Sequence, residues 1–299
     1  MRITNSIIVQ TQLAGLQTNM NAINTAQSEV SSGKKIQVAS DDPTAASGIM
    51  TASSTLRAIT QYQTNVSSAT DRVNAEDSTL SQLTDLMTRA QEISVQEGSS
   101  TASSSTRAAA AQEAQGLLQS AIQLGNTKFG DEYLFGGDAS TTAPFAMTGS
   151  GATASYTASG ATGQRTVSIG DGETMVVSHT AGQVFVASGV LDSLVQLTSS
   201  LASGDVAGIN AANTSIGTAF DNVQSSVGDV GARGDELQAA SSALQTLQGN
   251  VASHQSDLQD VDVASAITDL TSRQTAYQAA LVAISKTNTL SLTDYLTAS

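Results

Sequence analysis

The chain has 299 residues, 39% of them hydrophobic but only 3% aromatic, and it contains no cysteine and no tryptophan. Its net charge of −14 leaves no basic stripe that could displace counterions, which excludes nucleic acid as a partner. The lack of cysteine excludes disulfides, thiolate metal sites and cysteine nucleophiles.

Apolar residues near the N-terminus recur in alternating steps of four and three, the heptad spacing of a coiled-coil helix. The pattern predicts a helix that presents one narrow apolar face to a partner. This N-terminal seam consists of Val9, Leu13, Leu16, Met20, Ile23 and Val30.

A polar stretch, SSGKKIQVASDDPTAASGIM (31–50), interrupts this helical pattern. Gly33 is suited to end the first helix, an aspartate at Asp41 or Asp42 can cap the next, and Pro43 fits a first helical position. These four residues are expected to form a joint between two long helices.

A second heptad seam runs from Val66 to Ala90 and includes one acid, Glu76. It is expected to stop at Gly98, and a third helix is expected at about 106–128 after a serine-rich loop. Every other position of this seam is apolar: Val66, Ala69, Val73, Leu80, Leu83, Met87 and Ala90.

Residues 131–186 read as a small β domain inserted between helices. QRTVSIGDGETMVVS (164–178) has two β-rich arms about a Gly-Asp-Gly turn, which predicts a hairpin, and ASYTASGATGQ (154–164) suggests another. An apolar cluster beside Gly136 and Gly137 is expected to pack this domain onto the helices, with an exposed partner patch as the alternative: Tyr133, Leu134, Phe135 and Phe145.

Heptad spacing returns from Leu237 to Val261 and continues, with a shifted phase, toward the C-terminus. The expected fold is mainly α: a long antiparallel coiled-coil rod built from both chain ends, with the inserted β domain. The last seam contributes Ile267, Leu270, Tyr277, Leu281 and Ile284, and the ending LSLTDYL (290–296) adds Leu292 and Tyr295 to the candidate assembly interface.

Three domains follow from this pattern. Residues 1–42 with 255–299 are expected to form a terminal coiled-coil domain that lines an inner tube. Residues 43–130 with 187–254 form a helical rod domain, and residues 131–186 form the β domain. The chain ends hold so few apolar residues that we expect their helices to order only when neighbouring subunits cover them.

Candidate chemical sites are sparse. His179, expected in a strand, and His254, expected as a polar seam position, have no cysteine or carboxylate pattern that would complete a metal set. Asp41 and Asp42 could be imagined as a calcium cluster with the acids at 257, 260 and 262, but their spacing fits helix capping better. Catalytic residues, cofactors and metals are therefore not expected.

Targeting signals are also absent from the sequence. The sequence contains no run of eighteen apolar residues, the length needed to span a membrane, so no membrane partner is expected. No apolar stretch long enough for a signal-peptide core follows Met1 and Arg2. The chain is expected to stay in the cytosol or to leave the cell by a route that reads no cleavable leader.

The joint, EVSSGKKIQVASDDPTAASGIM (29–50), resembles that of the bacterial flagellin superfamily, and LTSRQTAYQAALVAISKTNTLSL (270–292) is similar to its paired terminal helices. Within the superfamily, three stretches resemble the hook-associated protein 3 family: GDEYLFGG (130–137), VGARGDEL (230–237) and the ending LSLTDYL. The stretch Arg233-Gly234-Asp235 also spells an integrin-ligand tripeptide, but it lies inside a predicted helix.

The resemblance implies a structural subunit, not an enzyme, that forms the junction layer between flagellar hook and filament. It implies unfolded passage through the flagellar type III route to an extracellular place. The implied partners are further copies of the chain, hook-associated protein 1, flagellin and a cytoplasmic export chaperone. Flagellin itself and a surface adhesin are the alternative functions.

Overall fold

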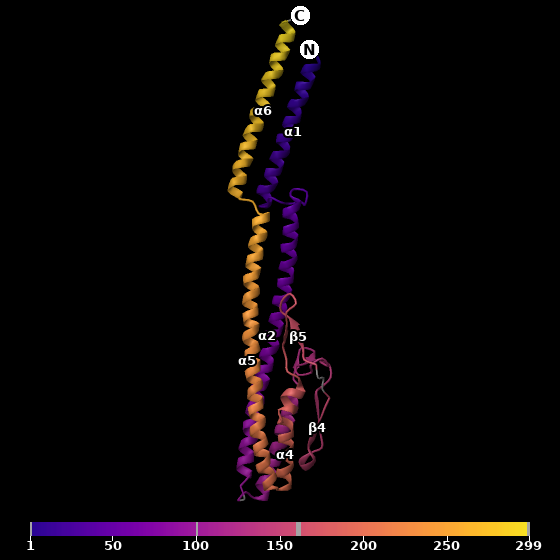
Figure 1. Cartoon of the computed structure of the whole chain (residues 1–299), viewed down its shortest axis with the longest axis vertical. Helices are drawn as coiled ribbons and strands as arrows, with labels where there is room; N and C mark the ends of the chain where they lie inside the picture. The colour runs from indigo at the N-terminus through magenta and orange to yellow at the C-terminus, as the bar shows by residue number, and fades with distance from the viewer. Residues whose placement is uncertain (1, 100, 160–162, 298–299) are drawn as a thin grey trace. The chain divides into compact units, whose positions relative to one another are not determined.

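The computed structural model describes residues 2–99, 101–159 and 163–297, with side chains described at residue 7 and over most of 9–286. Six α-helices dominate the described chain (Figure 1). They are α1 Arg2–Ser32, α2 Pro43–Glu97, α3 Ser104–Gly125, α4 Val190–Ser203, α5 Val206–Gln259 and α6 Val263–Thr297.

Two compact units divide the chain: unit 1 is residues 1–57 with 248–299, and unit 2 is residues 58–247. Helices α2 and α5 each contribute to both units. The antiparallel helices and the strand insertion confirm the predicted fold class, whereas the predicted three-domain division stays a prediction.

Unit 1 is built on α1 and α6, which pack side by side (Figure 1). Among their described side chains only Ile23, Ala26 and Ala266 are buried. The first turns of α2 and the last turns of α5 complete this unit, and Gly48 lets them approach because an added Cβ would lie 2.9 Å from Leu258 Cδ1.

Unit 2 holds most of the hydrophobic core. All eight positions of the seam from Val66 to Ala90 are buried, as the heptad spacing predicts, and α2 ends at Glu97, directly before Gly98. Helix α3 packs on α4, which is the most apolar helix and buries eight of its 14 residues. The predicted third helix at 106–128 forms as α3, but it ends three residues earlier at Gly125.

Three separate two-stranded antiparallel sheets are formed by the described residues of the strand region in unit 2. The predicted hairpin at 164–178 is confirmed as β5–β6, with Thr166 opposite Val176. The second hairpin suggested within 154–164 is wrong: the described residues of this stretch contribute only β4, which pairs backward with β3 across a turn that holds Gly149 and Gly151 at positive φ. The strands are β1 Lys128–Phe129, β2 Glu132–Tyr133, β3 Phe145–Thr148, β4 Ser155–Ala158, β5 Thr166–Ser168 and β6 Thr174–Val176.

A π-helix, η2 Gly182–Ala187, connects the strands to α4, and a short 3-10 helix, η1 Gly151–Thr153, lies between β3 and β4. The predicted apolar cluster packs inside unit 2. Phe185 of η2 makes edge-to-face contacts with Phe135 at 5.3 Å and with Phe145 at 5.6 Å between ring centroids. Leu134, Phe135 and Phe145 are buried, which favours the packing interpretation over an exposed partner patch.

Candidate assembly surface and polar clusters

Large hydrophobic side chains are exposed mainly in unit 1. Of the twelve that are exposed among the described residues, ten lie in this unit, although unit 2 is the larger of the two. Leu13 is 59% exposed and Ile7 is 56% exposed on α1, while Val282 on α6 is 55% exposed. Two helices that pack mainly on each other cover one narrow face each, which leaves these described apolar side chains exposed.

The predicted assembly residues fall into three groups. Ile23 is buried in the α1–α6 contact. Leu16, Val30, Leu270, Tyr277 and Ile284 are half-buried, and Val9, Leu13, Met20, Ile267 and Leu281 are exposed. The side chains of Leu292 and Tyr295 lie outside the described residues.

Three exposed residues of these helices did not appear among the predicted assembly residues: Ile7, Val263 and Val282. Ile7 and Val282 lie off the heptad positions, so the seam pattern did not select them, whereas Val263 lies four residues before Ile267, ahead of the predicted start of the last seam. Their hydropathy was the available signal, and their exposure is visible only once the α1–α6 contact is known.

The connector between α1 and α2 contains a helix stop and a helix start. Gly33 adopts φ +70° and donates its N–H to Glu29 O at 2.8 Å, which ends α1. Asp42 Oδ1 accepts the N–H groups of Thr44 and Ala45 at 2.9 and 3.0 Å, and Pro43 is the first residue of α2.

Asp41 closes the loop of the joint. Its Oδ2 accepts the main-chain N–H groups of Gln37 at 3.0 Å and Val38 at 3.1 Å. The hydrogen bonds from Val38 and Gln37 favour the ionised carboxylate, so they hold the pKa of Asp41 below its ordinary value.

The acids near residue 260 also act at helix ends. Asp262 Oδ1 accepts the N–H groups of Ala264 and Ser265 and caps α6 as Asp42 caps α2. No group of three or more His, Cys, Asp or Glu side chains that could hold a metal ion occurs among the described residues. The hydrogen bonds of Asp42 and Asp262 to the first N–H groups of their helices are those of helix caps.

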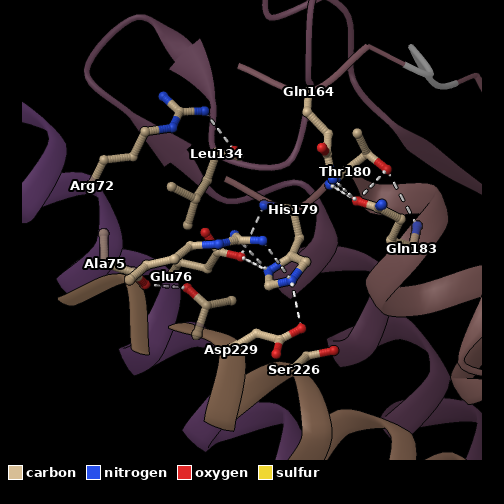
Figure 2. A network of polar contacts seen from close by, with 12 residues as sticks. Arg72, Ala75, Glu76, Leu134, Gln164, His179, Thr180, Gln183, Ser226 and Asp229 are labelled. Atoms are coloured by element: carbon tan, nitrogen blue, oxygen red, sulfur yellow. Dashed lines mark hydrogen bonds and ion pairs between the residues drawn. The ribbon is translucent and has the colours of Figure 1, made fainter. Parts of the chain in front are cut away.

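A buried polar network in unit 2 joins α2, α5 and the segment before η2 (Figure 2). His179 lies in this segment outside any strand, so its expected place in a strand is wrong. Its Nδ1 lies 2.6 Å from Glu76 Oε1, which also accepts the His179 main-chain N–H at 3.1 Å. The Arg233 guanidinium lies against the imidazole, with Nη2 3.1 Å from Nε2.

Glu76 has no exposed surface, and its Oε1 faces the imidazole of His179, which also contacts the Arg233 guanidinium. Asp229, exposed on α5, lies 3.7 Å from His179 Nε2. The seam pattern placed Glu76 on the buried face of α2 but gave no signal for its partner, which is 103 residues away.

Arg72 extends the polar contacts toward β2. Its Nη2 donates to Leu134 O at 2.6 Å, and its Nη1 lies 3.7 Å from Glu132 Oε2. Desolvation, followed by the nearby Arg165 cation, lowers the pKa of Arg72. Arg165 pairs with the same carboxylate of Glu132, so one acid holds two cations beside the strands.

The remaining candidates lie in helix α5. Arg233 and Asp235 lie within α5, as predicted, so their tripeptide is not on a loop tip. His254 is exposed on α5 and lines a shallow groove with Ser47 and Thr51 of α2. Among the helices of the described residues, none is long and apolar enough to cross a membrane.

Comparison with known proteins gives two family matches. Residues 3–140 match the bacterial flagellin N-terminal helical region, and residues 213–296 match the bacterial flagellin C-terminal helical region. Together they account for most of both units, including the joint and the α1–α6 pair.

Individual relatives agree with these matches. The chain is 31% identical over 186 residues to flagellar hook-associated protein 3 of Salmonella typhimurium, covering 62% of this chain and 57% of that protein. It is 29% identical over 309 residues to flagellar hook-associated protein 3 of Escherichia coli, covering 92% and 96%. The crystal structure of the flagellar junction protein FlgL from Legionella pneumophila superposes with a TM-score of 0.55 at 17% identity, covering 71% and 99%, and shares the fold.

Proposed function

Because this chain belongs to the bacterial flagellin family, we propose that it is a structural subunit of the flagellum that forms the junction layer between hook and filament. Its similarity to two flagellar hook-associated proteins 3 supports this role over that of flagellin. No catalytic step is part of the proposal.

The observation that carries the proposal is the exposed apolar surface of α1 and α6. Leu13, Ile267 and Leu281 are more than 40% exposed on helices that bury only three described side chains between them. In a tube of like copies, each α1–α6 pair would be covered by its neighbours, and burial of these side chains would drive assembly.

The same surface argues for ordering that is coupled to assembly. Each residue fixed in a helix costs conformational entropy, and the α1–α6 contact offers little apolar burial to offset it. The two helices therefore persist only when neighbouring subunits cover them, and in the free subunit they fray from the chain ends inward.

Export and partners follow from this role. We place the mature subunit outside the cell, delivered unfolded by the flagellar type III route, with hook-associated protein 1 on its hook side and flagellin on its filament side. A cytoplasmic chaperone would cover the apolar face of α6 before export. Retention in the cytoplasm after deletion of residues 2–30, with export of the unmodified chain as the control, tests the N-terminal part of this route.

Immuno-electron microscopy distinguishes the junction role from the filament role. An antibody against the strand region is expected to label a single band at the base of each filament, and loss of the protein is expected to release unpolymerised flagellin into the medium. Labelling along the whole filament would instead make the chain a flagellin. Loss of surface binding, but not of motility, after deletion of residues 138–183 would favour an adhesin.

A further inference from the structure

Two connectors of unit 1 pair as a short antiparallel ladder. The connector after α1 and the one before α6 exchange two main-chain hydrogen bonds: Lys35 N–H donates to Gln259 O at 2.8 Å, and Val261 N–H donates to Gly33 O at 3.0 Å. Lys34 and Asp260 are the residues directly opposite each other. We call this ladder, residues 33–35 and 259–261, the strand clasp.

Side chains reinforce the strand clasp. Lys35 Nζ donates to Asp257 O at 2.8 Å, and Ile36, the next residue, is only 8% exposed. The bond pattern makes Lys34 and Asp260 a non-hydrogen-bonded pair, in which opposed side chains approach most closely, and their charges are opposite.

The strand clasp lies next to the C-terminal end of α1 and the N-terminal end of α6. Gly33 ends α1 through its left-handed conformation, and Asp262 caps α6 one residue after the ladder. The C-terminal end of α1 and the N-terminal end of α6 are therefore fixed, and the ladder holds them beside each other. Helix nucleation is the costly step and propagation is easy, so a helix that grows from a fixed end avoids most of that cost.

We infer that the strand clasp stays closed in the free subunit and is the inner limit of the segment that orders on assembly. From it, α1 and α6 grow outward together as neighbouring copies cover them. This inference rests on the proposed assembly role and adds to it the point at which order begins.

Amide hydrogen exchange on the full-length free subunit tests the inference residue by residue. The amides of Lys35 and Val261 are expected to exchange more than about tenfold more slowly than those between Gln10 and Gln17, because ladder bonds persist while outer helical turns open. If the amides of Lys35 and Val261 are unprotected and exchange as fast as unprotected outer amides, the inference is overturned but the assembly role is untouched. If all these amides are equally protected, the ends are already ordered and assembly-coupled ordering fails instead.

A matched pair of proline variants tests whether the strand clasp matters for assembly. Val261→Pro removes the N–H that bonds to Gly33 O, whereas Val263→Pro places proline at the first residue of α6, as Pro43 stands after Asp42 in α2. We expect Val261→Pro to lose protection at Lys35 and to add onto isolated hooks at least about fivefold more slowly. Val263→Pro should keep the protection at Lys35.

The strand bonds within unit 2 provide the folding check for both variants. Unchanged exchange at the β5–β6 hairpin shows that the subunit is folded. A folded Val261→Pro variant that loses protection at Lys35 but assembles at the normal rate would overturn the inference, as would a Val261→Pro variant whose Lys35 amide stays protected.

Discussion

His179 shows how a single residue can hold together parts of unit 2 that are far apart in the sequence. Its ring and its main-chain N–H both bind Glu76 Oε1, and Glu76 has no exposed surface. His179→Ala would leave that carboxylate short of a partner, so we expect the unfolding free energy of unit 2 to fall by about 3 kcal/mol.

The other histidine provides the control for that measurement. His254 is exposed on α5 and makes no contact with the network, so His254→Ala should change the unfolding free energy by less than about 0.5 kcal/mol. Denaturant unfolding of both variants measures the difference, and equal stabilities would contradict the structural role of His179.

Asp41 makes the joint sensitive to acid. Its folded-state pKa is lowered by hydrogen bonds from Val38 and Gln37, so its stabilising contribution is complete above the unfolded value of about 3.9 and is lost as the pH falls through the lower folded value. The amide resonances of Gln37 and Val38 should therefore shift with a midpoint below about 3.9. A midpoint at or above that value, or one that persists in Asp41→Asn, would contradict this assignment.

At the scale of the elements, glycines in two helices give opposite predictions. Gly231 in α5 is exposed and an added Cβ would meet nothing within 4 Å, so Gly231→Ala should stabilise unit 2 by about 1 kcal/mol. At Gly125, the last residue of α3, a Cβ would lie 2.6 Å from the Phe145 ring, so Gly125→Ala should destabilise it. Thermal unfolding measures both, and shifts of the same sign would contradict the packing described here.

Elements with a local signal could be predicted from the sequence. The seam from Val66 to Ala90 is buried because heptad spacing fixes one face of a helix, and the β5–β6 hairpin forms about its Gly-Asp-Gly turn. Contacts between residues far apart in the chain produce no periodic pattern in the sequence, so they could not be predicted. Examples are the pairs Lys34–Asp260 and Glu76–His179. The π-helix Gly182–Ala187 likewise has no distinctive spacing.

At the scale of the whole molecule, a heptad pattern does not specify which partner covers an apolar face. Heptad seams in α1, α2 and α6 look alike in the sequence, yet the α2 seam is buried in unit 2 while Leu13, Ile267 and Leu281 are exposed in unit 1. A seam specifies that a face needs a partner, but not whether the partner is the same chain or another copy. Candidate assembly residues could be selected by pattern, but which of them are exposed could be seen only in the structure.

Substitution of exposed terminal residues should separate stability from assembly. Combining Leu13→Gln with Leu281→Gln changes only surface side chains, so monomer stability should change by less than about 1 kcal/mol. Addition onto hooks should fall more than about tenfold, because neighbouring copies lose the apolar contact. Val95→Gln, at a 64% exposed position in unit 2, should assemble normally, and equal assembly of both variants would contradict the proposed surface.

The state of the chain ends in the free subunit tests the account most directly. Circular dichroism and limited proteolysis of the dilute full-length protein are compared with the same protein after assembly. The account predicts early cleavage within α1 and α6, protection of the chain between Gly33 and Asp262, and a gain of helical signal on assembly, since these two helices contain 31 and 35 residues. A free subunit with full helical signal and protease-resistant ends would contradict it.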